Sequence, residues 1–146
     1  MDRIRAAIEP IKRRIMMAVA RAVVRGINDA AGRQLLQIEV LKGELRADVE
    51  RMQDYGFTSV PLPGADAAVV FVAGNREQGI ILAVDDRRYR PTGLQPGEAC
   101  IYTNQAGHKI LMKAGQEIHL IAGASSIVMT PAGITITAPV VNFVAG

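Results

Sequence analysis

The chain has 146 residues, which is enough for one ordinary domain with extensions. Its 17 lysines and arginines and 14 aspartates and glutamates give a formal net charge of +3, and most of the excess lies in residues 1–25. The rest of the chain is close to neutral, which argues against a nucleic-acid surface over the body of the protein. The single cysteine, Cys100, excludes an internal disulfide, and its strand-like setting (EACIYT) predicts a packed thiol rather than a nucleophile.

The N-terminal sequence shows no pattern of a secretory signal. The first residues carry arginines throughout and lack both a long apolar run and a small-residue cleavage site. No stretch reaches the roughly 20 apolar residues that a membrane-spanning helix needs. We therefore expect the chain to be made and folded in the cytoplasm, or to leave it without cleavage.

The N-terminal segment 1–21 has the periodicity of an amphipathic helix. Apolar residues recur every three to four positions, at Ile4, Ile8, Ile11, Ile15, Val19 and Val23. Pro10 should end or kink the first turns. Such a helix could lie on a membrane surface, or dock on a partner subunit or on its own oligomer. The apolar face lacks an aromatic anchor, which favours docking on protein.

Residues 22–90 form the predicted β domain. A strand at 22–27 precedes a turn, and 34–41 alternates with Leu36, Ile38 and Val40 on one face. Val49 and Met52 are further candidates for the core. Two apolar runs, 69–72 and 80–84, flank a Gly-rich turn. Five or six short strands in roughly 65 residues predict a small closed barrel of the OB-like type.

A turn-rich neck, 91–106, leads through a strand at 99–103 into a glycine-punctuated repeat, 107–146. Glycines at 107, 115, 123 and 133 open successive units within which residues alternate. Eight apolar side chains fall on one face: Ile110, Met112, Ile118, Leu120, Ile127, Met129, Ile134 and Ile136. The other face is mostly polar but also carries Leu111, Ile121 and Val128. Short strands repeated in this way predict a solenoid or β-helix.

A single ribbon of this kind leaves its apolar face and its edges uncovered. The simplest solution is several identical chains that wind together, with the eight apolar side chains lining a shared axis. The alternative is a meander hairpin that folds back onto the preceding domain.

Several motifs resemble the Mu-type baseplate assembly protein V family, the central spike of contractile-tailed phages. They are YGFTSVP at 55–61, PG at 63–64, DDRRYR at 85–90 and GE at 97–98. The resemblance covers residues 22 to about 115. The N-terminal segment and the repeat resemble the family in general character more than in their individual residues. It implies a homotrimer with an OB barrel at its base and a triple-stranded β-helix as its shaft. It also implies a virion protein on the baseplate hub that helps to pierce the host outer membrane.

The histidines depart from this family, whose members often end in a tip that holds a metal through an H-x-H arrangement. Here His108 and His119 are the only two histidines, and they cannot form such a pair within one chain. We expect both to point outward, and we expect no metal or cofactor. The tip would then be a separate protein or would be missing from this chain.

Three classes of function follow. The first is a structural spike, not an enzyme, in a phage or in a phage-like secretion or tailocin particle. The second is an OB module for single-stranded nucleic acid, although the predicted barrel offers few aromatic platforms beside basic residues. The third is a hydrolase, which we set aside because no catalytic constellation is visible and the chain has no room for an inserted domain.

Overall fold

The structure is a computed structural model that describes residues 2–105 and 107–143. The chain divides into two compact units, Met1–Arg87 and Arg88–Gly146. The fold is mostly β with one N-terminal helix, as predicted. Among the described residues, no helix is both long enough and apolar enough to span a membrane. Residue 106 of the predicted neck and residues 144–146 of the predicted repeat lie outside the described residues.

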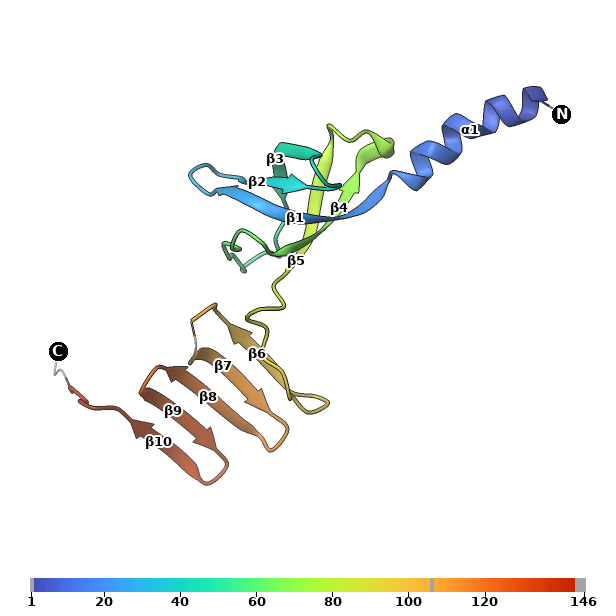
Figure 1. The fold of residues 1–146 in the computed structure, drawn as a ribbon. Coiled ribbons are helices and arrows are strands. Elements are labelled where there is room, and N and C mark those ends of the chain that lie inside the picture. The colour runs from blue at the N-terminus through green and yellow to red at the C-terminus, as the bar shows by residue number, and fades with distance from the viewer. Residues whose placement is uncertain (1, 106, 144–146) are drawn as a thin grey trace. The chain divides into compact units, whose positions relative to one another are not determined.

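The first unit contains a closed five-stranded barrel, which confirms the predicted architecture (Figure 1). Its elements are α1 (Asp2–Met16), β1 (Val19–Asn28), β2 (Gln34–Glu39), β3 (Leu45–Arg51), β4 (Asp66–Phe71), the 3₁₀ turn η1 (Val72–Gly74) and β5 (Gly79–Asp85). The strand order around the barrel is β1-β2-β3-β5-β4. Of the strand pairings in this barrel, only the short one between β3 and β5 is parallel. This arrangement fits an OB-like barrel.

The barrel interior is filled by alternate residues of the strands, as period-two geometry requires. The largest fully buried side chains are Phe71, Leu36, Ile38, Ile81, Val24 and Val69. The inward positions predicted for Leu36, Ile38 and Val49 are confirmed. The prediction for Met52 was wrong, because β3 ends at Arg51 and Met52 is 58% exposed in the loop that follows.

The boundary between helix and barrel differs from the predicted one. The helix ends at Met16, and β1 already begins at Val19, which pairs with Val70 of β4. The β-branched residues of this segment suit either element locally, and pairing with β2 and β4 decides for a strand. Pro10 lies inside α1 on its exposed surface and does not end the helix.

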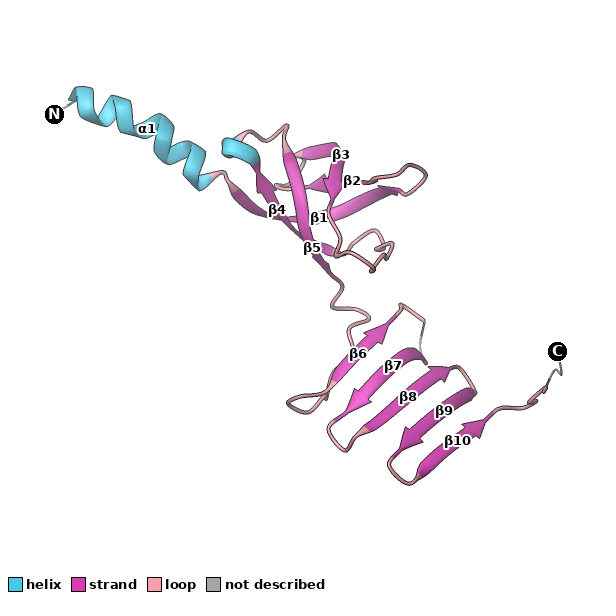
Figure 2. Cartoon of the chain, turned by 180° about the vertical axis from the view of Figure 1, so that it is seen from behind, coloured by secondary structure: helices cyan, strands magenta, loops and turns pink. Residues whose placement is uncertain are grey.

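The second unit is a single antiparallel sheet in meander order (Figure 2). Its strands are β6 (Ala99–Tyr102), β7 (His108–Lys113), β8 (Glu117–Ala122), β9 (Ser125–Thr130) and β10 (Gly133–Thr137). Each strand pairs with the next along the chain, so β6 and β10 form the two edges. The short strands predicted from the repeat are therefore present. The winding of several chains around one another stays a prediction.

Candidate functional site: the apolar face of the β6–β10 sheet

Strand register collects the apolar residues of the repeat into two rows on one face of the sheet. Pairings between neighbouring strands join Ile101, Ile110, Leu120, Ile127 and Ile136 into the first row. The second row joins Ala99, Met112, Ile118, Met129 and Ile134. All eight residues singled out from the sequence thus share one face, which we call the apolar face.

The apolar face is largely open to solvent in the single chain. Ile110, Met112 and Ile118 are each about two-fifths exposed, at 38%, 41% and 39%. At the edge strand β10, Ile134 and Ile136 reach 68% and 53%. A contiguous exposed apolar surface of this kind marks an interaction site in soluble proteins.

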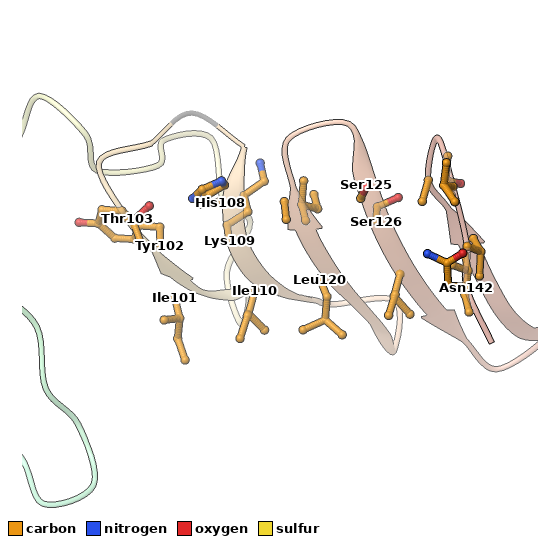
Figure 3. A pocket seen from close by; sticks show the side chains of 18 residues that line it. Ile101, Tyr102, Thr103, His108, Lys109, Ile110, Leu120, Ser125, Ser126 and Asn142 are labelled. Atoms are coloured by element: carbon orange, nitrogen blue, oxygen red, sulfur yellow. The ribbon is translucent and has the colours of Figure 1, made fainter. Parts of the chain in front are cut away.

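The first row lines a shallow hollow of about 670 Å³. Figure 3 shows that the side chains of Ile101, Ile110 and Leu120 point the same way, into this hollow. The segment after β10, including Val140 and Val141, borders it on the far side. Polar residues such as Thr103 and Ser126 lie at its border, but the row of isoleucines and Leu120 gives the hollow a mainly apolar surface. It therefore suits apolar side chains from another protein surface better than a polar ligand.

The opposite face mixes polar and apolar residues. Leu111 and Val128 flank His119 in one row, and Ile121 lies beside Lys109 in the next. His119 is held by the Glu117 carboxylate, with 2.8 Å between Nε2 and Oε2, and Lys113 lies 4.0 Å from the same carboxylate. The prediction that three apolar residues share this face is therefore confirmed by the register.

The prediction for this sheet missed one residue of the apolar face, and its expectation for one histidine was wrong. Ile101 belongs to the apolar face, and the alternation in EACIYT was a signal that could have placed it there. His108 pairs with Ala122, and strand alternation places it on the face of Ile110 rather than on the outward face. Among the described residues of the single chain, no group of three His, Cys, Asp or Glu side chains could hold a metal ion.

The barrel surface bears on the nucleic-acid alternative. Several of its arginines are held by carboxylates: Arg25 by Glu39, Arg33 by Glu50, Arg46 and Arg76 by Glu44, and Arg87 by Asp66. Tyr55 and Phe57 are exposed, but they lie in the β3–β4 loop and not on a strand face. Since phosphate binding needs free cations beside stacking platforms, this surface does not favour single-stranded nucleic acid.

Comparison with known proteins identifies the family. A family model described as Bacteriophage Mu Gp45, N-terminal, matches residues 21–88. The chain is 46% identical over 131 residues to the baseplate puncturing device gp45 of Escherichia phage Mu. It is also 41% identical over 117 residues to the Mu-like prophage FluMu protein gp45 of Haemophilus influenzae. The chain belongs to the Mu-type baseplate assembly protein V family.

The similarity within this family reaches beyond the barrel. The two alignments cover 85% and 80% of the chain, whereas the first compact unit ends at Arg87 of 146 residues. The β6–β10 sheet is therefore included at least in part. In the other direction, the chain spans 66% of the phage Mu relative and 63% of the Haemophilus relative.

Proposed function

We propose that this protein is the trimeric central spike of a contractile phage tail baseplate and helps to puncture the host outer membrane. The observation that carries the proposal is the apolar face of the β6–β10 sheet, which one chain leaves exposed. The name of the phage Mu relative, a baseplate puncturing device, supports the same function. In this proposal the protein is a structural component and not an enzyme.

Three copies of the chain can bury the apolar face that a single copy leaves exposed. If three sheets turn their apolar faces toward a common axis, the two rows of aliphatic side chains form a continuous core. Each buried aliphatic side chain then contributes on the order of 1.5–3 kcal/mol. The edge strands β6 and β10 can pair with neighbouring copies, which removes the unpaired edges that otherwise invite aggregation. The result is an intertwined triple-stranded β-helix in which all eight predicted residues line the axis.

The parts of the chain take separate roles in this proposal. The barrel at 22–90 forms the base and contacts a baseplate hub protein, the segment 91–106 is a neck, and residues 107–146 are the shaft. Assembly takes place in the host cytoplasm, the finished protein resides in the virion tail, and the outer membrane is contacted only transiently.

The oligomeric state tests this function directly. Light scattering on the purified chain at micromolar concentration should give three times the 15.7-kDa chain mass. The measurement is decisive because the shaft requires several copies, whereas an OB binding module or a hairpin folded on its own barrel does not. A folded, β-rich monomer would contradict the spike.

A further inference from the structure

Helix α1 carries an apolar stripe that the described residues of its own unit leave exposed. Ile4, Ile8, Ile11 and Ile15 are 68%, 52%, 58% and 70% exposed. The helix meets the barrel at its last turn, where the backbone of Arg14 lies so close to Gly74 that an added Cβ would be 2.5 Å from the Arg14 carbonyl oxygen. This contact holds the end of α1 and leaves the stripe free.

The spacing of the four isoleucines is that of a coiled coil. The steps of four, three and four residues place Ile4 and Ile11 at d positions and Ile8 and Ile15 at a positions of a heptad. Isoleucine at both a and d favours three or four strands over two. Pro10 falls at a c position, on the outer surface of such a bundle, so its ring does not enter the interface.

We propose that the α1 helices of three copies form a parallel three-stranded coiled coil through these isoleucines. The proposal rests on the trimer proposed above and adds a second interface at the N-terminal end of the chain. A 15-residue helix with an internal proline is marginal in isolation, so packing against its copies supplies the stability that the helix alone lacks.

The charges beside the stripe select the parallel arrangement. In parallel helices a g residue lies near the e residue five positions later on the next helix. Lys12 then faces the neutral Ala7, and Arg14 faces position 19, which belongs to β1, so no like-charged pair forms. In an antiparallel pair the e positions face each other, and Arg5 would lie beside Lys12 of the other helix. That contact would be repulsive, so the sequence disfavours antiparallel pairing.

The net charge of α1 provides a way to distinguish the coiled coil from binding of α1 to a lipid surface. The helix has five basic residues, Arg3, Arg5, Lys12, Arg13 and Arg14, and two acidic ones, Asp2 and Glu9, so three bundled helices repel one another weakly over their outer surface. Salt screens this repulsion, since the Debye length falls from about 30 Å at 0.01 M to about 3 Å at 1 M. The coiled coil therefore tightens as salt rises, whereas binding to an anionic membrane would weaken.

Cysteine cross-linking in the full chain tests the bundle. In a Cys100→Ser background, Ile8→Cys places three thiols near the axis, and Ala6→Cys places them at the outward f position as a matched control. Under mild oxidation the Ile8→Cys protein should form covalent dimers at least about tenfold faster, because f positions of a parallel bundle point apart. The rate should increase between 0.01 M and 1 M salt. Ile11→Cys, at a d position, repeats the test should Ile8→Cys perturb the helix.

The outcomes distinguish the two proposals. Equal cross-linking rates for the a, d and f positions in a protein that light scattering shows to be trimeric would overturn the coiled coil and leave the spike standing. A monomer would overturn the spike and the bundle together. Salt-sensitive binding to phosphatidylglycerol vesicles that abolishes cross-linking would replace the coiled coil with a lipid-binding helix.

Discussion

The Glu98 side chain connects two turns of the second unit through hydrogen bonds. Its carboxylate accepts hydrogen bonds from the backbone N–H of Gln95, at 3.0 Å, and from that of Ala114, at 3.5 Å. The Gln95 N–H has the largest effect in lowering the pKa of Glu98, and the Ala114 N–H and the charge of Lys113 lower it further. One ionised carboxylate thus joins the turn before β6 to the turn after β7.

This lowered pKa makes a pH-dependent contribution to stability. Because the folded-state pKa lies below the ordinary value of 4.5, the unfolded chain takes up the proton first as the pH falls. The contribution is therefore complete above about pH 4.5 and is lost as the pH falls through the folded-state pKa. Glu98→Gln should lower the Tm at pH 7, and the difference from wild type should shrink toward pH 3. Glu77→Gln, at an exposed loop position, is the control and should show no such trend.

Ile136 and Thr135 are neighbours on β10 that point to opposite faces of the sheet. Both are exposed in the single chain, so a carboxylate at either position would be harmless in a monomer. In the proposed trimer, Ile136→Asp brings three charges into an apolar core, at a cost of several kcal/mol for each ion. Thermal melts and light scattering should show dissociation or a large loss of Tm for Ile136→Asp and little change for Thr135→Asp. Equal effects would contradict the assignment of the axis-facing side.

At the scale of elements, α1 and β1 have separable tasks. The Val19–Val70 pairing makes residues 19–21 part of the barrel, so a deletion that tests the helix must stop at Met17. Removal of residues 2–17 should leave a soluble protein with an intact barrel and shaft, because none of the described α1 side chains belongs to the barrel core.

The same deletion should abolish incorporation into tails, since we expect the N-terminal helices to form a docking element for a baseplate subunit. Complementation of a spike-deficient phage with the truncated gene, scored by plaque counts and by the protein content of purified tails, measures this. Normal incorporation of the truncated protein would show that docking depends on the barrel alone.

At the scale of the whole molecule, the proposed spike acts by shape and resistance to force. Sheath contraction would supply the work, and the shaft must stay folded while it crosses the membrane. Interwound strands suit this task, because no strand can leave without breaking the ladders on both sides, which makes unfolding slow.

Kinetic stability of this kind predicts protection from proteases. Residues 107–146 of the intact trimer should resist trypsin and proteinase K at room temperature and should remain associated in SDS. The Ile136→Asp protein, if it dissociates, is the matched control and should be cleaved rapidly in the same segment. Cleavage of the wild-type segment at the rate of an unfolded chain would contradict the mechanical role.

The order of residues alone was enough to predict the class of the fold and the eight repeat residues that share the apolar face. Side chains of a strand must alternate, so a repeat with apolar residues at every second position fixes which of them share a side. For the same reason Leu36 and Ile38 could be assigned to the barrel core without a structure. The family motifs between residues 55 and 98 likewise required nothing beyond the order of residues.

Where each element begins, and which elements pair, depends on contacts between distant parts of the chain. The valines at 19 and 23 fit a helical or an extended period, and their ladder partners on β2 and β4 made them a strand. Met52 is exposed because β3 stops one residue earlier. Alternation in EACIYT indicates which residues of β6 share a side with Ile101, and the pairing of Ile101 with Ile110 shows that this side is the apolar face. Local patterns fix which way a side chain points relative to its neighbours in sequence. Pairing with distant strands fixes what it meets, and that information is not contained in any local stretch of the chain.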